Sequence, residues 1–246
     1  MKIALIGYGQ MGKIIHKLAE KRNHQIVAII DPTIEDTDKF DKIAKADICI
    51  DFSTPKAVLS NFKEIVKYKK DVIIGTTGWL HNLSEIKLLL KKTNCGIIYG
   101  SNFSVGMNIF FQINRYAAKL MNKLNSYDVY GYEMHHKRKK DSPSGTAIEL
   151  TKVLLENIDR KETAQFDRMN REIKPEELHF ASIRSGDING THFVGYDSTA
   201  DSIELKHKAK NRNGFALGAI LAAEWQIKNH KIGYSNFKDI FEEVVK

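Results

Sequence analysis

One stretch of the sequence gathers the side chains best suited to chemistry. Residues 135–147 read HHKRKKDSPSGTA, so two histidines and a run of cations stand directly before a Ser-Gly-Thr turn. Imidazole and ammonium groups can both donate a proton to a reacting substrate. His135 and Lys139 are therefore the candidates for proton transfer.

The Ser-Gly-Thr turn at Ser144, Gly145 and Thr146 opens a predicted helix. A helix start offers backbone N–H groups and the positive end of the helix dipole, and both favour an anion. With the two hydroxyls and with His136, the turn would form a binding site for a substrate carboxylate. These four residues are the substrate-binding candidates.

Other interpretations of the stretch remain open. A run of cations is most often a solvated loop, and Lys137, Arg138 and Lys140 fit that interpretation. A nucleic-acid site would call for interleaved aromatic residues, a recognition helix or zinc-ligand spacing beside the run, and the sequence has none of these there. Paired histidines can bind a metal, but no further ligand stands at metal-site spacing, so we expect no metal and no nucleic acid.

A second candidate site lies at the start of the chain. Gly7, Gly9 and Gly12 form a G-x-G-x-x-G pattern between an apolar strand and a helix, and Asp31 ends the next strand. In such loops the glycines allow a tight turn, close approach of a pyrophosphate and close helix packing, while the acid binds the ribose. The pattern predicts a bound dinucleotide. A tight turn without a ligand is the alternative.

The choice between NADH and NADPH stays open. Asp31 favours NADH because its charge repels a 2′-phosphate, and no arginine follows it. Lysines such as Lys39 or Lys42 would compensate for that repulsion if they lie nearby.

Three more loops follow apolar strands, where open α/β sheets bind ligands. They are DFST at Asp51–Thr54, GTTG at Gly75–Gly78 and SNFS at Ser101–Ser104. Small side chains there let the backbone approach a nicotinamide and its ribose. Ordinary turn chemistry and a helix cap are the alternatives.

The elements that position these loops alternate in type. Apolar strand-like runs recur with helical segments between them, which predicts a Rossmann-like, doubly wound parallel sheet of the α/β class. The predicted order is KIALIG, a helix, QIVAIID, ADICIDFS, a helix over 55–69, DVIIGTTG, a helix over 82–93, and GIIYGSNF.

The pattern changes after Phe103. A long amphipathic helix runs to Leu124, YDVYGYEM reads as a strand, and hairpin-like strands follow from His179. This predicts a second α+β domain with a mainly antiparallel sheet, and helices over 214–227 and 236–245 that return to the first domain. The predicted boundaries are 1–104 completed by 214–246, and 105–213, with an irregular polar connection over 157–178.

Composition limits the partners and the compartment. The chain has 246 residues with a formal charge of +8, which favours anionic partners. Cys49 and Cys95 lie in or beside apolar runs without a CxxC spacing, so we expect reduced thiols. The N-terminus does not read as a signal peptide, and no apolar run approaches the ~20 residues of a membrane span. We therefore expect a cytoplasmic protein.

The cationic stretch also carries a resemblance. Nine positions match the pattern E-x-H-x-x-x-K-x-D-x-P-S-G-T-A, namely Glu133, His135, Lys139, Asp141, Pro143, Ser144, Gly145, Thr146 and Ala147. This pattern resembles the signature of the dihydrodipicolinate reductase family, also called 4-hydroxy-tetrahydrodipicolinate reductase. The glycine loop, GTTG, SNFSVGMN and SGD at 185–187 extend the resemblance over most of the chain.

The resemblance implies hydride transfer from NADH or NADPH to a cyclic unsaturated dicarboxylate, giving tetrahydrodipicolinate in the diaminopimelate route to lysine. It implies that His135 is the acid/base residue, that Lys139 donates a proton, and that the second domain binds substrate and builds a homotetramer. The cofactor-binding residues that it implies are Gly7, Tyr8, Gly9, Gln10, Met11, Gly12, Asp31, Gly75, Thr76, Thr77, Ser101, Asn102, Phe103 and Ser104.

Two rival functions are compatible with the sequence. One is another NAD(P)-dependent amino- or hydroxy-acid dehydrogenase with the same two-domain plan. The other is a redox-sensing nucleic-acid binder, which the net charge and the lysine-arginine run would suit.

Overall fold

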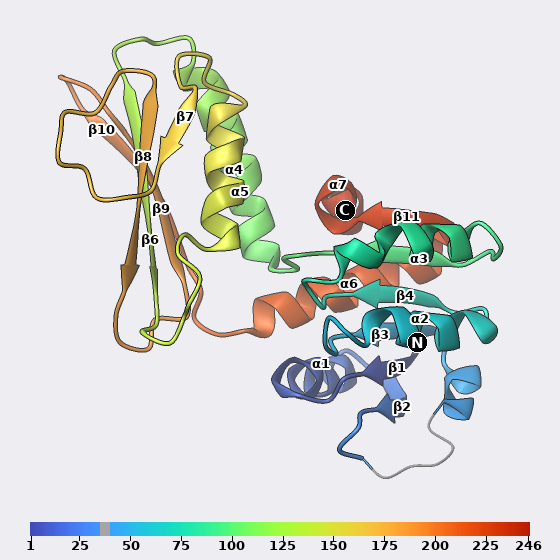
Figure 1. The fold of residues 1–246 in the computed structure, drawn as a ribbon. Coiled ribbons are helices and arrows are strands. Elements are labelled where there is room, and N and C mark those ends of the chain that lie inside the picture. Colours follow the sequence, from blue (N-terminus) through green and yellow to red (C-terminus); the bar gives the residue numbers. More distant parts are fainter. Residues whose placement is uncertain (35–39) are drawn as a thin grey trace. The chain divides into compact units, whose positions relative to one another are not determined.

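The chain folds into two compact units, each with its own sheet (Figure 1). The computed structural model describes residues 1–34 and 40–246. The first unit comprises Met1–Val105 and Arg212–Lys246, and the second comprises Gly106–Asn211.

The first unit is a six-stranded parallel sheet in the order β11-β5-β4-β3-β1-β2. Its strands are β1 (Lys2–Ile6), β2 (Gln25–Ile30), β3 (Ile48–Asp51), β4 (Asp71–Ile74), β5 (Gly96–Tyr99) and β11 (Gly233–Asn236). Its helices are α1 (Gln10–Lys21), α2 (Val58–Lys67), α3 (Leu83–Leu90), α6 (Asn213–Asn229) and α7 (Phe237–Val244), with short 3₁₀ helices at η1 (Asp41–Lys45) and η2 (Leu80–Asn82). This is the Rossmann-like sheet that the sequence predicts.

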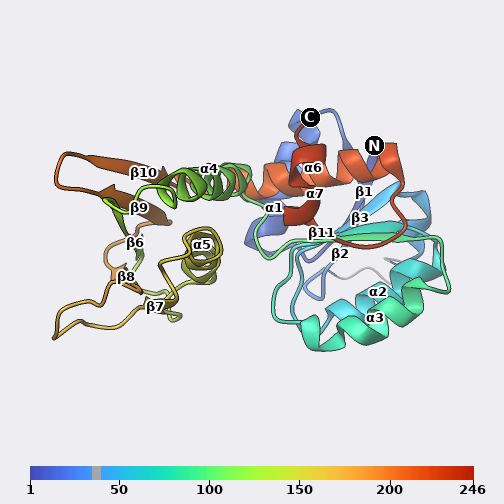
Figure 2. The same cartoon turned by 90° about the horizontal axis from the view of Figure 1, so that it is seen from above.

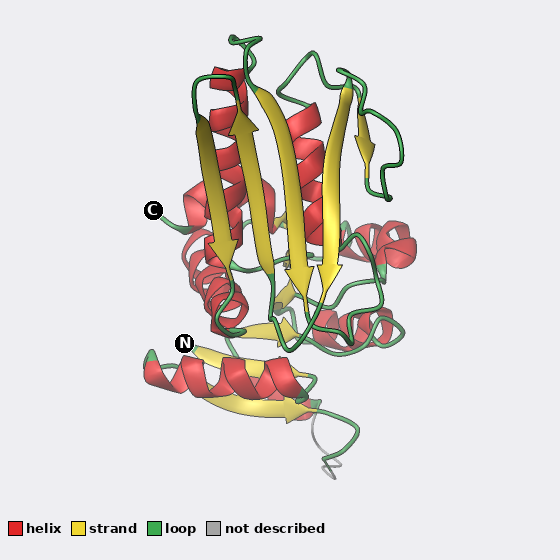
Figure 3. Ribbon diagram, turned by 90° about the vertical axis from the view of Figure 1, so that its left-hand side faces the viewer, coloured by secondary structure: helices red, strands yellow, loops and turns green. Residues whose placement is uncertain are grey.

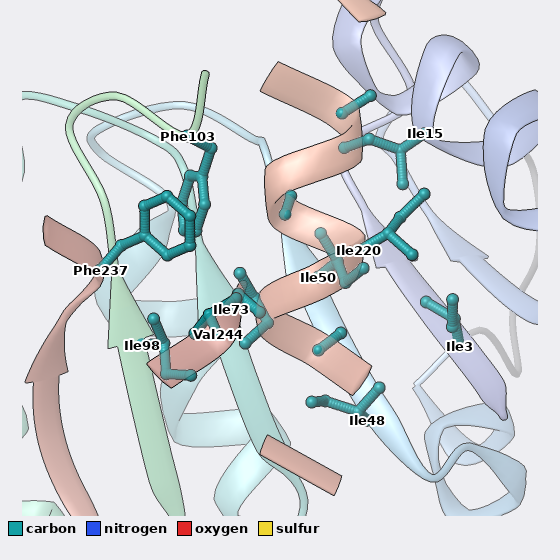
Figure 4. Close-up of a cluster of buried hydrophobic side chains, with 14 of the residues drawn as sticks. Ile3, Ile15, Ile48, Ile50, Ile73, Ile98, Phe103, Ile220, Phe237 and Val244 are labelled. Carbon is teal, nitrogen blue, oxygen red and sulfur yellow. The ribbon is translucent and has the colours of Figure 1, made fainter. Parts of the chain in front are cut away.

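Apolar residues of β1 point alternately to two cores, because successive side chains of a strand face opposite sides. Ile3 and Leu5 belong to a cluster with α1, α6 and α7, while Ala4 and Ile6 belong to a cluster with α2 and α3. Figure 2 shows these two helical layers on either side of the sheet. Figure 4 shows the first cluster, in which Phe103 packs against Phe237 with ring centroids 4.5 Å apart.

Residues 212–246 complete the first unit. The predicted helices correspond to α6 and α7, and α6 packs against α1. The strand β11 between them is absent from our sequence prediction. It pairs with β5 at the edge of the sheet, and its GYSN sequence has only one large apolar residue, so tertiary pairing decides its conformation.

The second unit is a five-stranded sheet in the order β10-β9-β6-β8-β7. Helices α4 (Val105–Met121) and α5 (Gly145–Leu155) belong with this sheet, and Figure 3 looks onto the face that these helices leave open. The strands are β6 (Asp128–His135), β7 (Thr163–Gln165), β8 (Glu177–Arg184), β9 (Thr191–Asp197) and β10 (Ser202–Lys208).

This sheet contains the antiparallel pairs that we predicted and, at one side, parallel pairs that we did not. β10, β9 and β6 pair antiparallel as hairpin patterns predict, but β6 pairs parallel with β8, and β8 pairs parallel with β7. The reason is the connection from β6, which passes through α5 before the chain returns, as parallel strands require. β7 lies inside the segment 157–178 that we predicted to be irregular, and three residues are too few for a periodic signal.

The helix-covered face of β6 changes from apolar to polar along the strand. Val129 and Gly131 are buried beside the core of the unit, and Glu133 and His135 follow on the same face, also buried. The strand thus carries two titratable side chains to the N-terminal end of α5.

No helix in the described chain combines the length and the apolar composition needed to cross a membrane.

Candidate active site

The predicted cofactor loops of the first unit lie side by side at one edge of the sheet. The last residues of the strands form a row of partners, Ile30 with Ile6, Ile6 with Asp51, Asp51 with Ile74, and Ile74 with Tyr99. Each following loop therefore starts at the carboxyl edge, next to the loop of the neighbouring strand. This is where open α/β sheets bind ligands.

The three glycines of the first loop meet different constraints. Gly7 has a φ of 86°, and a Cβ on it would lie 2.5 Å from the Phe52 carbonyl oxygen. A Cβ on Gly12 would lie 2.3 Å from the Gly7 oxygen, so only glycine lets α1 pack this closely. A Cβ on Gly9 would meet no atom of the described residues within 4 Å. The loop thus presents accessible backbone at Gly9, which suits a pyrophosphate.

Asp31 lies against the glycine loop. Its Oδ2 accepts a hydrogen bond from the Tyr8 backbone N–H at 2.6 Å, and its Oδ1 accepts from the Thr33 N–H and hydroxyl at 2.9 and 2.6 Å. Both the ribose role and the turn role that we predicted for Asp31 are compatible with this geometry. Of the two lysines considered for a 2′-phosphate, Lys42 lies in η1, and Lys39 lies outside the described residues.

A buried carboxylate holds two of the loops together. Asp51 is 1% exposed, and its Oδ1 accepts from the Ser53 N–H, the Ser53 hydroxyl and the Thr76 hydroxyl at 2.9, 2.7 and 2.9 Å. Its Oδ2 accepts from the Asn61 amide at 3.0 Å. Burial raises the pKa of the Asp51 carboxyl, and these hydrogen bonds only partly oppose the rise. Thr76, a predicted cofactor residue, is thereby fixed to the DFST loop.

The remaining predicted cofactor residues differ in exposure. Phe103 is buried in the core beside Phe237, and Ser104 is buried, while Ser101 and Thr77 are exposed and Asn102 is half-buried. Because its ring packs in the core, Phe103 anchors the 101–104 loop to the first unit.

One cation beside the glycine loop was missed by sequence reasoning. The Arg212 guanidinium donates a hydrogen bond to the Gln10 side-chain oxygen at the start of α1. The two residues are 202 positions apart in the sequence, so no local pattern could link them. Met11, the next predicted cofactor residue, packs partly buried against the first core cluster.

In the second unit the cationic stretch pairs with the loop after β8. The backbone N–H of His136 donates to Ile188 at 2.8 Å, that of Lys137 donates to Gly186 at 3.1 Å, and that of Ser185 donates to His135 at 2.9 Å. The loop 185–190, which contains the SGD motif, therefore holds the backbone of both histidines.

Glu133 is the centre of the site. It is fully buried, and its Oε1 accepts from the Ser144 N–H at 2.9 Å, the Ser182 hydroxyl at 2.9 Å and the Arg184 guanidinium at 2.8 Å. Its Oε2 accepts from the Ser144 hydroxyl and lies 3.3 Å from His135 Nδ1.

A second histidine shares the Oε2 atom of Glu133. His192 Nε2 lies 3.4 Å from it, and His192 is 4% exposed. The match to a family signature already included Glu133, but His192, Arg184 and Ser182 were not among our predicted site residues. They lie on β8 and β9, far from Glu133 in the sequence, and only the strand pairing brings them together.

The predicted proton donor Lys139 is held by an acid. Its Nζ lies 2.8 Å from Asp141, and the Lys139 side chain is 23% exposed. The hydrogen bond from Lys139 is the main cause of a lowered pKa at Asp141, so the carboxyl stays ionised beside the ammonium group.

The Ser-Gly-Thr turn forms the start of α5, as predicted. The Ser144 hydroxyl oxygen caps the helix by accepting from the Ala147 N–H at 3.1 Å, and both Ser144 donors reach Glu133. Ser144 is thus committed to Glu133, while Gly145 is exposed and Thr146 half-buried at the first turn. Lys137, Arg138 and Lys140 are exposed, and Arg138 pairs with exposed Asp187 at 2.7 Å.

Ligand types alone would allow a metal at this site. The donor atoms of Glu133, His135 and His192 lie within 4.8 Å of one another, which the spacing in the sequence does not reveal. The chemistry of the donor set argues against a cation, because the Arg184 guanidinium already neutralises the carboxylate. The cluster suits proton transfer better than metal binding.

Two family models together match almost the whole chain. One, described as Dihydrodipicolinate reductase, N-terminus, matches residues 1–103, and one described as Dihydrodipicolinate reductase, C-terminus, matches residues 106–241.

Curated relatives and a solved structure agree with these matches. The 4-hydroxy-tetrahydrodipicolinate reductase of Christiangramia forsetii is 42% identical over 246 residues, which are 100% of both chains. That of Rickettsia bellii is 33% identical over 239 residues, which are 96% of this chain and 92% of the relative. A dipicolinate-bound dihydrodipicolinate reductase from Paenisporosarcina sp. TG-14 is similar with a TM-score of 0.76 and 20% identity, over 98% and 99% of the two chains, which shows the shared fold.

Proposed function

The chain belongs to the dihydrodipicolinate reductase family, and we propose that its two units divide that family's reaction between cofactor binding and proton transfer. Its activity is that of an NAD(P)H-dependent oxidoreductase, the 4-hydroxy-tetrahydrodipicolinate reductase reaction of the diaminopimelate route to lysine. The substrate is a cyclic unsaturated dicarboxylate, and the product is tetrahydrodipicolinate.

The dinucleotide-binding domain that we propose, residues 1–104 and 214–246, lies within the first unit and differs from its bounds by at most two residues. Accessible backbone at Gly9 and the Asp31 carboxylate would hold the pyrophosphate and the ribose, and the loops at 75–77 and 101–104 would line the nicotinamide side. When bound, NADH or NADPH supplies the hydride.

The substrate-binding and oligomerisation domain that we propose, residues 105–213, contains the second unit and exceeds its bounds by at most two residues. Hydride addition leaves negative charge on the substrate, which a nearby cation stabilises while a proton arrives. His135 acts as the acid/base group, and Lys139 donates the proton. His136 and the start of α5 at 144–146 bind the substrate carboxylates. The observation that carries these roles, in a chain of this family, is the buried hydrogen-bond network of Glu133, whose Oε2 lies 3.3 Å from His135 Nδ1.

The decisive experiment is a turnover assay. The pyruvate and aspartate-semialdehyde condensation product is supplied with NADH and, separately, with NADPH, and cofactor oxidation is followed. We expect turnover with at least one cofactor, and the ratio of kcat/KM values gives the preference. Failure with both would favour another dehydrogenase of the same fold.

Lys139→Ala tests the proton donor. We expect kcat to fall by roughly a hundredfold, because a positioned general acid contributes about this much, while the Kd for the cofactor stays nearly unchanged. Lys140→Ala is the matched control, since Lys140 is an exposed neighbour in the same run. Near-normal turnover of Lys139→Ala would remove Lys139 from the mechanism.

We further propose a homotetramer in the cytoplasm that does not bind nucleic acid. Two apolar surfaces of the second unit support the assembly. One is the open face of the sheet, with Tyr130 at 39% and Ile183 at 44% exposure. The other is a groove between α4 and β10, where Ile113 and Tyr116 are 47% and 67% exposed. A tetramer with two-fold axes needs two self-complementary interfaces.

Two observations support the proposed compartment and the proposed absence of a nucleic-acid partner. Cys49 and Cys95 are free and buried, as in reducing compartments. Arg138 of the cationic run is paired with Asp187. DNA binding with a steep salt dependence would contradict this part of the proposal.

A further inference from the structure

A row of polar side chains crosses the second sheet at one level. Strand register makes His207 of β10 the partner of His192, His192 the partner of Glu133, and Glu133 the partner of Ser182. Partner residues of adjacent strands point to the same face, so these four side chains lie on one side of the sheet. His135 and Arg184 form the next pair on that face, two residues further along.

The Glu133 carboxylate at the centre of this row is ionised. Burial by itself would raise its pKa, but contacts from His135, His192, Ser144 and Arg184 outweigh burial and hold the pKa well below the usual range of a glutamate. An ionised carboxylate can only accept hydrogen bonds.

This fixes which ring nitrogens carry hydrogen. His135 approaches the carboxylate with Nδ1 at 3.3 Å, and His192 approaches it with Nε2 at 3.4 Å. Neither contact has hydrogen-bond geometry, but a carboxylate at this distance favours a hydrogen over a lone pair on the nitrogen that faces it. The other nitrogen of each ring, Nε2 of His135 and Nδ1 of His192, is then the one that can accept a proton.

We propose that Glu133 and His192 are positioning residues that fix the hydrogen of His135 on Nδ1, so that His135 exchanges a proton with the substrate through Nε2. This inference rests on the acid/base role proposed for His135. Neither positioning residue touches the reacting atoms, since both act through the imidazole of His135.

His192 brings a ring nitrogen to 3.4 Å from Glu133 Oε2 without adding a second full charge. Burial is the main cause of a lowered pKa at His192, and it outweighs the opposite effect of Glu133, so the ring is neutral near neutral pH. With a neutral His192 ring near Oε2, the Arg184 guanidinium at 2.8 Å from Oε1 balances the charge of the carboxylate. The two imidazoles meet edge to face, with centroids 5.2 Å apart, which limits rotation of the His135 ring.

The reactive edge of His135 is kept open by a glycine. A Cβ on Gly190 would lie 3.1 Å from His135 Nε2 and 3.4 Å from its Cδ2. A side chain at 190 would therefore crowd the nitrogen to which we assign proton exchange.

Arg184 connects the same carboxylate to Lys139. Its Nη2 donates to Glu133 Oε1 at 2.8 Å and to the Asp141 carbonyl oxygen at 2.6 Å, and the Asp141 side chain holds Lys139. The Glu133 carboxylate therefore helps to position both side chains that we propose for proton transfer, His135 directly and Lys139 through Arg184 and Asp141.

The first test measures the hydrogen positions directly. Nitrogen chemical shifts of ¹⁵N-histidine-labelled protein distinguish the two neutral tautomers, and His135→Gln assigns the signals of His135. We expect the Nδ1–H tautomer for His135 and the Nε2–H tautomer for His192 in the unmodified protein. An Nε2–H tautomer at His135 would overturn the inference without any substitution at Glu133.

The second test removes the charge of the carboxylate. In Glu133→Gln we expect a mixture of His135 tautomers, a kcat at least about tenfold lower, and a KM within about threefold. Glu204→Gln, which changes an exposed carboxylate on β10 of the same sheet, is the control and leaves the tautomer and kcat as in the unmodified protein. An unchanged His135 tautomer in folded Glu133→Gln contradicts the inference.

A third variant covers the case in which Glu133→Gln does not fold. His192→Phe keeps an aromatic ring at this position but removes the ring N–H that faces Oε2, so we expect a kcat several-fold lower with cofactor binding retained. Full activity of His192→Phe would exclude His192 as a positioning residue. Normal turnover of His135→Gln would instead contradict the proposed acid/base role of His135, whichever tautomer is found. Failure of that role and failure of the positioning inference are therefore distinguishable.

Discussion

Two buried carboxylates in this protein have opposite pKa shifts. Within the described residues, the donors to Asp51 are neutral groups, and burial raises its pKa. Glu133 is also buried, but its partners include the Arg184 guanidinium, and its pKa is lowered. Neutral donors stabilise a buried charge less than charged donors do. The charge of the hydrogen-bond partners, and not the residue type, therefore decides whether a buried acid is ionised.

Gly190→Ala tests the space beside His135. The added methyl group would lie about 3.1 Å from His135 Nε2, so we expect it to block substrate approach and to lower kcat/KM by at least about tenfold. Steady-state kinetics with the substrate measure this, and cofactor binding should not change because Gly190 lies in the second unit.

The control for this change is Gly186→Ala. Gly186 also has a positive φ, of 51°, in the same loop, but a Cβ there would meet no described residue within 4 Å. It therefore carries the backbone strain without the obstruction. Equal losses in both variants would mean that strain in the loop, and not access to His135, causes the effect.

At the scale of the elements, the sequence predicts those strands that are buried on both sides. β1, β3, β4 and β5 are continuous apolar runs, and each lies in the parallel sheet as expected. β7 and β11 were missed because TAQ and GYSN carry no periodic pattern, and only pairing with β8 and β5 makes them strands.

Glu177 anchors the start of β8. Arg171 donates to both of its carboxylate oxygens at 2.7 and 2.8 Å, Gln165 of β7 donates at 3.0 Å, and the Lys174 N–H donates at 3.0 Å. The hydrogen bond from Arg171 is the largest cause, followed by that from Lys174, of a pKa lowered from 4.5 to about 2.

Glu177→Gln should therefore destabilise the protein in a pH-dependent way. Because the pKa of Glu177 is lower in the folded than in the unfolded protein, its ionised carboxylate contributes its full stabilisation of the fold at pH values above the unfolded pKa of 4.5. That contribution is lost as pH falls from about 4.5 to about 2. The difference in urea midpoint between the two proteins should be largest near neutral pH and should shrink over that window.

Glu176→Gln is the matched control for the anchor. Its carboxylate makes no ion pair within the described ranges 1–34 and 40–246, so its removal should leave the urea midpoint nearly unchanged. A constant difference between Glu177→Gln and the unmodified protein at all pH values would show that the charge of Glu177 is not what stabilises β8.

At the scale of the whole molecule, the parts of the two sites differ in how well the sequence predicts them. The loops that we propose to bind the cofactor lie at the carboxyl edge of the sheet, as expected, because each follows its own apolar strand, which is a local signal. The network around His135 was only partly found. His135 and Ser144 share one motif with Glu133, but Arg184 and His192 arrive on other strands, and their register is a tertiary property.

The proposed tetramer gives a prediction at this scale. Ile113→Asp places a charge in the apolar groove between α4 and β10, where burial against a second copy would desolvate it. We expect the mass measured by light scattering to fall from that of a tetramer to that of a smaller species. Lys119→Gln changes the charge of the same helix by the same amount outside the groove and should remain tetrameric.

The discontinuous first unit also constrains how the protein is made. One core cluster of this unit needs Ile220 and Phe237, which the ribosome adds only after all of the second unit has been translated. Until then, the sheet face formed by Ile3, Leu5 and Ile50 has no helix from α6 or α7 to cover it. During synthesis the nascent chain therefore exposes an apolar surface in its N-terminal half, while the second unit contains all of its own elements and can fold first.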